Sequence, residues 1–217
     1  MRNKRFGKLL SAALAAAMAL SLSSAALAAG NGETHLTIIG TSDTHGNIWG
    51  YSYEDMKEST GDGLARVSAY CNQVRSENRN TILVAWTLGN HEFNFGVDTL
   101  KSILEQVDMP VLAANIKNAD GSYFTGAGYT IVERGGVKVA IIGVTTPNIP
   151  RWDGTKQGVA DLTFEPMADA VAPCIQEIGG KADVIMVSTH AGLGAEYSAD
   201  GSDAAQTILD KCPEVDV

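Results

Sequence analysis

Short apolar runs rich in Val and Ile alternate with segments of helical periodicity, and this alternation limits the possible folds most strongly. Apolar residues recur at helical spacing between Leu64 and Val74 and again between Val97 and Val107. Strands that alternate with helices are typical of α/β domains with a largely parallel inner sheet. The runs that we expect to form strands are LTIIG (36–40), TILVAW (81–86), PVLAANI (110–116) and DVIMVSTH (183–190).

The second half of the chain adds an antiparallel element to this pattern. TIVERGGVKVAIIGV (130–144) predicts a hairpin that turns at Gly135-Gly136, with its second arm fully buried. A helix is expected from Pro166 to Ile178, ended by glycine, and a short one from Ala204 to Leu209. The predicted fold class is therefore α/β with mixed sheets.

The N-terminus has the pattern of a cleaved export signal. Four basic residues precede an apolar stretch from Leu9 to Leu22, and Ala26-Leu27-Ala28 follows with small residues at both outer positions. The stretch is too short and Ala-rich for a spanning helix, and no later segment is apolar enough to span a membrane. We expect residues 1–28 to be a signal peptide and the protein to be exported, periplasmic or extracellular.

The charge of residues 29–217 limits the ligands that they can bind, and their cysteine content limits how the fold is stabilised. Without the four basic residues of the signal, 12 of the 16 basic residues remain against 25 acidic ones, a net charge of about −13. Such a surface repels nucleic acid polymers, and a small anionic substrate would need a local cation such as a metal ion. Three cysteines are too few for a disulfide framework, so the core must stabilise the fold.

Three of the four histidines follow apolar runs in polar turns, whereas His35 is predicted to have no role. The carboxyl ends of strands in α/β sheets are where functional side chains gather. Imidazole, carboxylate and carboxamide oxygen together suit divalent ions such as Mn²⁺, Zn²⁺ or Fe²⁺. The residues in these turns are Asp43, His45, Asn90, His91 and His190.

Two other hydrolytic site types are not supported. The chain has no G-x-S-x-G elbow that would make Ser42 or Ser188 a nucleophile, and it has no G-x-x-x-x-G-K-[ST] phosphate loop. A metal-dependent site is the remaining interpretation.

TSDTHGN, TLGNHEFNFG and VSTHAGL resemble three signature blocks of the calcineurin-like metallophosphoesterases. The chain is most similar to the exported 5′-nucleotidase / 2′,3′-cyclic-nucleotide 2′-phosphodiesterase group. DGLARVSAY, MPVLAANI and VTTPNIPRWD favour the cyclic-nucleotide branch. The resemblance implies an α/β sandwich with mixed sheets and a hydrolase that acts on small nucleotides.

The resemblance also implies a site with two divalent metal ions, which could be Mn, Zn, Fe, Mg or Co. Asp43 and His45 match the ligands of one metal, and Asn90 and His190 match ligands of the second. His91 matches the catalytic histidine, which helps the leaving oxygen depart.

The chain departs from the family pattern at two places. After Val84 it lacks the Gly-Asp block whose Asp bridges the two metals, and it stops before a Gly-His-x-His turn and a C-terminal base-binding domain. We therefore expect residues 29–217 to be a partial catalytic domain with an internal deletion and impaired activity. The alternatives are a 5′-nucleotidase-like phosphatase and a non-catalytic exported protein that binds metal weakly at most.

Several neighbouring residues allow either a functional or a structural interpretation. Glu92 is expected to orient its turn, and Asn115 either supports the site or satisfies a strand end. Trp152-Asp153 could shape a substrate mouth or serve packing, and Arg151 could meet a phosphate or remain solvated.

Overall fold

The computed structural model describes residues 33–41, 50–52, 56–58, 63–84 and 86–217. The chain divides into two compact units, Met1–His35 and Leu36–Val217, and the helices and strands described all lie in the second. The expected signal peptide at 1–28 and the predicted ligands Asp43 and His45 fall outside the described residues. Across the described ranges, none of the helices has the length and hydropathy needed to cross a membrane.

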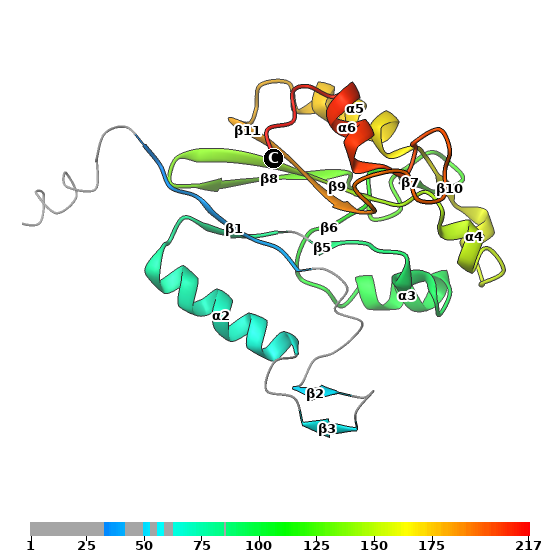
Figure 1. Cartoon of the computed structure of the whole chain (residues 1–217), viewed down its shortest axis with the longest axis horizontal. Helices are drawn as coiled ribbons and strands as arrows, with labels where there is room; N and C mark the ends of the chain where they lie inside the picture. Colours follow the sequence, from blue (N-terminus) through cyan, green and yellow to red (C-terminus); the bar gives the residue numbers. More distant parts are fainter. Residues whose placement is uncertain (1–32, 42–49, 53–55, 59–62, 85) are drawn as a thin grey trace, which may run out of the picture. The chain divides into compact units, whose positions relative to one another are not determined.

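The elements of the second unit follow the expected alternation in most places (Figure 1). In chain order they are β1 (Thr37–Ile39), β2 (Tyr51–Ser52), β3 (Lys57–Glu58), α2 (Leu64–Glu77), β4 (Thr81–Leu83), β5 (Trp86–Thr87), η1 (His91–Phe93), α3 (Val97–Leu104), β6 (Val111–Leu112), β7 (Ile116–Lys117), β8 (Tyr129–Arg134), β9 (Val137–Thr145), α4 (Ile149–Asp153), η2 (Val159–Asp161), β10 (Thr163–Phe164), α5 (Met167–Ile178), β11 (Val184–His190) and α6 (Ala205–Lys211).

Strand β9 is the centre of a three-stranded mixed sheet with the order β11-β9-β8. It pairs antiparallel with β8 and parallel with β11, whose His190 lies opposite Thr145. The β8–β9 hairpin turns at Gly135 and Gly136, whose φ angles of 59° and 80° are in the region that favours glycine. The predicted hairpin and the mixed α/β fold class are confirmed, but the second arm is not buried throughout, because Lys138 at the start of β9 is exposed.

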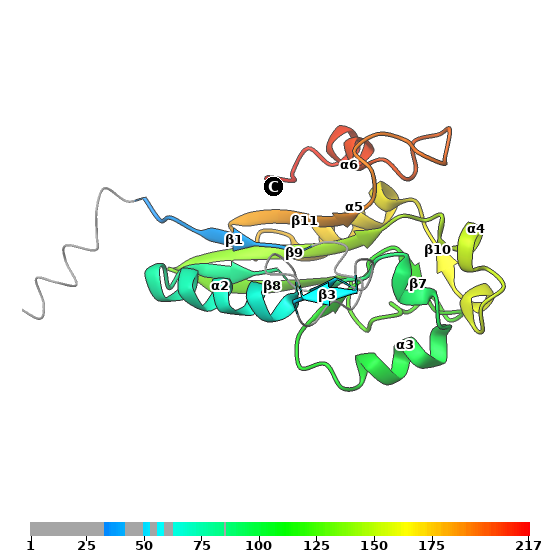
Figure 2. The same cartoon turned by 60° about the horizontal axis from the view of Figure 1, so that its bottom comes forward.

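Alternate residues of β9 face two different layers. Ala140, Ile142 and Val144 pack in a core with α5 and α6, while Val139 and Ile141 pack in a second core with Ile82 of β4. Because successive side chains of a strand point to opposite faces, one buried strand joins both cores. Figure 2 shows α5 and α6 on one side of the sheet and α2 on the other.

Two predicted strands are each divided in the structure. The expected single strand TILVAW was wrong: β4 pairs with β1, whereas β5 pairs with β6, so the two halves hydrogen-bond to different partners. PVLAANI is likewise split into β6, which pairs with β5, and β7, which pairs with β10, and the Asn115 side chain between them bonds to β9. Its amide donates to the Thr145 carbonyl at 2.7 Å and accepts from the Thr145 N–H at 3.0 Å.

All three cysteines are buried and unpaired. Burial raises the pKa of the Cys174 thiol, whose sulfur lies 3.6 Å from the Tyr123 hydroxyl, and burial also raises the pKa of Tyr123. These groups therefore stay neutral and belong to the core beside α5.

Strands β6 and β9 lie so close together at Gly143 that a methyl group added there should destabilise the fold. A Cβ added at Gly143 would lie 2.5 Å from Leu112 Cβ and 2.9 Å from the Leu112 carbonyl oxygen. We expect Gly143→Ala to lower the free energy of unfolding by about 1–3 kcal/mol, because the two strands must separate. Urea unfolding of the purified chain measures this change.

Gly194→Ala is the matched control, because a Cβ at Gly194 meets nothing within 4 Å and neither glycine has a positive φ. Equal unfolding midpoints for the two variants would contradict the packing between β6 and β9.

Candidate functional site

The ends of β5 and β11 bring two predicted metal ligands together. The Thr87 hydroxyl donates to the Ser188 hydroxyl at 2.8 Å, which ties the two strands side by side near their carboxyl ends. From there Asn90 and His190 meet, with Asn90 Oδ1 and His190 Nε2 3.0 Å apart. The Thr146 N–H also donates to the His190 carbonyl at 2.9 Å, which fixes the end of β11 against β9.

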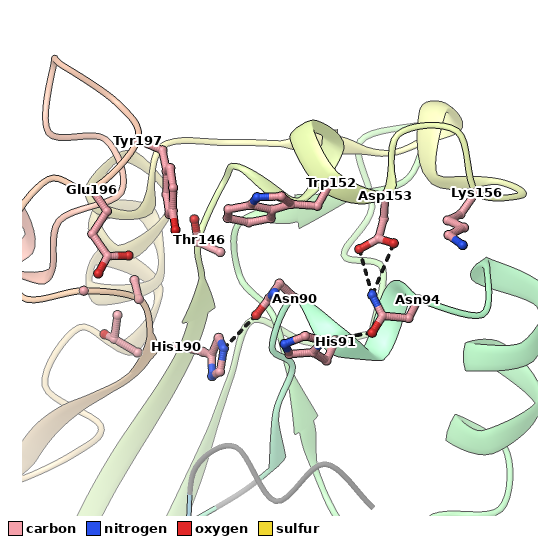
Figure 3. A pocket seen from close by; sticks show the side chains of 13 residues that line it. Asn90, His91, Asn94, Thr146, Trp152, Asp153, Lys156, His190, Glu196 and Tyr197 are labelled. Atoms are coloured by element: carbon pink, nitrogen blue, oxygen red, sulfur yellow. Dashed lines mark hydrogen bonds between the residues drawn. The ribbon is translucent and has the colours of Figure 1, made fainter.

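A cavity of about 770 Å³ opens beside this pair (Figure 3). Its volume lies in the range of small-molecule sites. His91 lies on the same side of the cavity as Asn90, and the α4 residues lie across it (Figure 3). The lining residues are Asn90, His91, Asn94, Thr146, Trp152, Asp153, Lys156, Thr189, His190, Ala191, Gly192, Glu196 and Tyr197.

Glycine at position 89 leaves room for two of these groups. A Cβ there would lie 2.9 Å from Glu92 Oε2 and 3.0 Å from both Cε1 and Nε2 of His190. The Gly89 N–H donates to Glu92 Oε2 at 2.7 Å, so Glu92 holds the turn in place, as the sequence indicated. The turn therefore forms a cradle around the imidazole of His190.

A chain of hydrogen bonds orients His91. Asp153 is 3% exposed, and its two carboxylate oxygens lie 3.2 and 3.0 Å from Asn94 Nδ2. Because a carboxylate only accepts, Asn94 must present its NH₂ to Asp153 and its oxygen to His91. Asn94 Oδ1 lies 2.9 Å from His91 Nδ1, so Nδ1 carries the proton and donates. In the neutral ring Nε2 is then the unprotonated nitrogen.

The rim opposite β5 is held by one buried carboxylate. Asp203 is 2% exposed, and its Oδ2 accepts from the Tyr197 N–H at 2.7 Å and from Asn148 Nδ2 at 3.1 Å. Asn148 immediately precedes α4, and its amide also donates to the Ser198 hydroxyl at 3.0 Å. Asp203 thus joins the loop after β11 to the start of α4.

The donor atoms near His190 fit a divalent ion in part. Two ligand atoms each about 2.1 Å from one metal and at right angles to each other are about 3 Å apart, which matches the Asn90–His190 separation of 3.0 Å. An imidazole nitrogen and a carboxamide oxygen suit borderline divalent ions. Within the described residues, no group of three or more His, Cys, Asp and Glu could hold a metal. Asp43 and His45, which the sequence assigned to the other metal, are not among those residues.

The sequence of the chain is similar to those of known nucleotide phosphoesterases. No protein-family model matches the chain. It is 28% identical over 229 residues to the trifunctional nucleotide phosphoesterase protein YfkN of Bacillus subtilis, covering 82% of this chain and 16% of that protein. It is 26% identical over 250 residues to the 2′,3′-cyclic-nucleotide 2′-phosphodiesterase/3′-nucleotidase of Haemophilus influenzae, covering 92% of this chain and 37% of that protein.

Solved structures give the same result. The crystal structure of the calcineurin-like phosphoesterase YfkN from Bacillus subtilis superposes with a TM-score of 0.72 at 26% identity, over 85% of this chain and 70% of that one. A 5′-nucleotidase precursor from Thermus thermophilus superposes with a TM-score of 0.58 at 25% identity, over 71% and 37%. The homologues and structural neighbours are calcineurin-like phosphoesterases, so the resemblance indicated by the sequence blocks is confirmed. More narrowly, the homologues are nucleotide phosphodiesterases and nucleotidases, and the chain spans well under half the length of the two curated relatives described.

Sequence reasoning missed five residues that shape the cavity. These residues lie in turns and loops without periodicity, and they are Asn94, Lys156, Glu196, Tyr197 and Asp203. Asn94 falls within the TLGNHEFNFG block, whereas no motif marked the others. Asn94 lies three residues after His91, a spacing at which side chains of one helical turn meet, and this was the available signal.

Substitution of Gly89 tests whether the cradle serves metal binding. We expect Gly89→Ala to weaken binding of Mn²⁺ or Zn²⁺ about tenfold or more, because the added methyl group displaces His190 from Asn90. Isothermal titration calorimetry of the full chain with each metal alone gives the dissociation constants. Gly194→Ala again serves as control. Unchanged metal affinity in Gly89→Ala would show that this turn does not contribute to metal binding.

Proposed function

We propose that this chain is a metal-dependent phosphoester hydrolase of small nucleotides, of the 2′,3′-cyclic-nucleotide phosphodiesterase type. The observation that carries the proposal is the meeting of Asn90, His91 and His190 at one cavity from two strand ends 100 residues apart. Side chains so distant in sequence converge at the carboxyl ends of strands, where α/β folds bind their ligands.

Each residue has a separate role in the proposed reaction. His190 and Asn90 would hold one divalent metal, and Asp43 and His45 are the expected ligands of the other. The two metals would supply Lewis-acid activation of water and of the phosphoryl oxygens. His91 acts as the acid when its ring carries protons on both nitrogens: it keeps the Nδ1 proton bonded to Asn94 and gives the Nε2 proton to the oxygen that leaves phosphorus. Asn94 and Asp153 keep the His91 ring in the orientation that presents Nε2 rather than Nδ1.

The similarity to known proteins supports a class of substrate, and the N-terminal sequence supports a location. The curated relative from Haemophilus influenzae is named for 2′,3′-cyclic nucleotides, which supports a small cyclic nucleotide as substrate. Export by the signal at 1–28 would place residues 29–217 outside the cytoplasm as a partial catalytic domain. We expect a low rate, because no Asp lies between Glu77 and Asp98 to bridge the two metals.

A 5′-nucleotidase-like phosphatase is the second candidate, supported by similarity to a 5′-nucleotidase of Vibrio vulnificus over 72% of this chain. A non-catalytic metal-binding protein is the third, supported by the absence of a bridging Asp from the sequence 78–97. These alternatives differ in substrate and in turnover, so one assay separates them.

Hydrolysis of 2′,3′-cyclic AMP by the full chain, with Mn²⁺, Zn²⁺ or Mg²⁺ supplied in turn, tests the proposal. We expect slow metal-dependent turnover that falls at least about 100-fold in His91→Ala, because proton transfer typically contributes 10²–10⁴-fold. His35→Ala is the matched control, since His35 is exposed and has no role in the proposed site.

Equal rates for His91→Ala and the unsubstituted chain would point to a contaminating phosphatase and contradict the assignment. Turnover of AMP alone would favour the 5′-nucleotidase, and metal binding without any turnover would favour the non-catalytic protein.

Asn94 provides a test of the positioning chain. We expect Asn94→Ala to lower kcat about 10- to 100-fold with little change in KM, because His91 loses the hydrogen bond that fixes its ring. Nitrogen-15 NMR of the histidine rings should also show His91 changing from the Nδ1–H tautomer to a mixture. Asn72→Ala, on an exposed face of α2, is the control. An unaltered tautomer in Asn94→Ala would exclude this role for Asn94.

A further inference from the structure

Two aromatic side chains lie at the mouth of the cavity, across from His91 and His190 (Figure 3). Trp152 comes from the end of α4 and is 40% exposed, and Tyr197 comes from the loop after β11 and is 48% exposed. Neither belongs to the hydrophobic cores, in contrast to Phe93, which is fully buried. Exposed apolar area at a cavity mouth is a mark of ligand-binding surface.

Both rings are restrained by contacts with neighbouring groups. They contact each other edge to face, with centroids 5.0 Å apart and planes at 85°, and the Arg151 guanidinium lies 5.3 Å from the centre of the Tyr197 ring. The Tyr197 N–H is bound by buried Asp203, which also holds Asn148 at the start of α4. A surface that is ordered before binding loses little conformational entropy when a ligand arrives.

The polar groups of the cavity suit the rest of a nucleotide. Lys156 lines the cavity, follows closely after Asp153 in the chain, and offers a cation to a phosphate in a strongly acidic protein. Glu196 lines the side next to Tyr197 and can accept hydrogen bonds from a ribose hydroxyl or an exocyclic amino group. Flat nucleobases stack on aromatic side chains without regard to sequence.

We propose that Trp152 and Tyr197 form a stacking site for the base of the nucleotide whose phosphoester is directed toward His91. The proposal rests on the proposed function for the identity of the substrate. It assigns base recognition to the catalytic domain itself. The same short helix α4 would then place Trp152 on the base and Asp153 behind His91 through Asn94.

The test compares a substrate that has a base with one that has none. We expect Trp152→Ala to raise KM for 2′,3′-cyclic AMP at least about tenfold and to leave kcat nearly unchanged, since stacking binds substrate and transition state alike. KM for glycerol 1,2-cyclic phosphate should not change. Trp152→Phe should keep most of the affinity because it keeps an aromatic face, and Tyr70→Ala, an exposed aromatic of α2, is the matched control.

Adenosine binding tests the same site without catalysis. In a His91→Ala background, adenosine should quench tryptophan fluorescence, and Trp152→Phe should remove most of this quenching although Trp49 and Trp86 remain. Quenching that depends on Trp152 in a chain that hydrolyses nothing would support the stacking site and refute only the proposed function.

Two results would overturn the proposal. One is an equal rise in KM for both substrates in Trp152→Ala, because the ring would then act on the phosphoester or on folding. The other is adenosine binding of equal affinity in Trp152→Ala, Trp152→Phe and Tyr70→Ala.

Discussion

The parallel ladder between β9 and β11 is the interaction on which the rest of the structure depends. It runs over seven residue pairs, from Val184 opposite Val139 to His190 opposite Thr145, and β9 is buried along almost all of that length. Because the strands are parallel and in this register, both carboxyl ends reach the same edge of the sheet. His190 is therefore positioned by backbone hydrogen bonds that do not depend on its own side chain.

The rest of the site is attached to this edge by side-chain hydrogen bonds. Thr87 bonds to Ser188, Asn115 bonds to the backbone at Thr145, and Asp203 joins the loop after β11 to α4. Each of these bonds is shielded from water to some degree, so the loss of one partner leaves a polar group without compensation. The cavity is consequently an extension of the core, although most of its lining belongs to turns and loops.

Much of the fold and part of the site could be predicted because they depend on short-range patterns. The periodicity of α2 and α5, the double glycine of the β8–β9 hairpin and the apolar run of β11 each follow from local sequence. The meeting of Asn90 and His190 followed from the rule that strand ends converge. The division of TILVAW between β4 and β5 could not be predicted in this way, because an apolar run does not record which strand each half will pair with.

The loop residues were unpredictable for another reason. Asp203 acts through atoms of Tyr197 and Asn148, and Asp153 acts through Asn94, so their positions depend on tertiary contacts that no periodicity reports. Trp152 and Asp153 were noticed in the sequence, yet only the structure distinguishes the exposed ring from the buried carboxylate. Adjacent residues on one short helix thus have opposite environments.

The sequence separations in the site also bear on how the protein folds. Asn90 is 100 residues from His190, Asn94 is 59 from Asp153, and Asn148 is 55 from Asp203. Contacts of such long range close large loops and form after local helices and hairpins. A nascent chain that has emerged only as far as β9 can hold its hairpin but has no cavity. The cavity is in this sense the last part to assemble, and a protein quality-control system would meet largely structured forms without the cavity before complete ones.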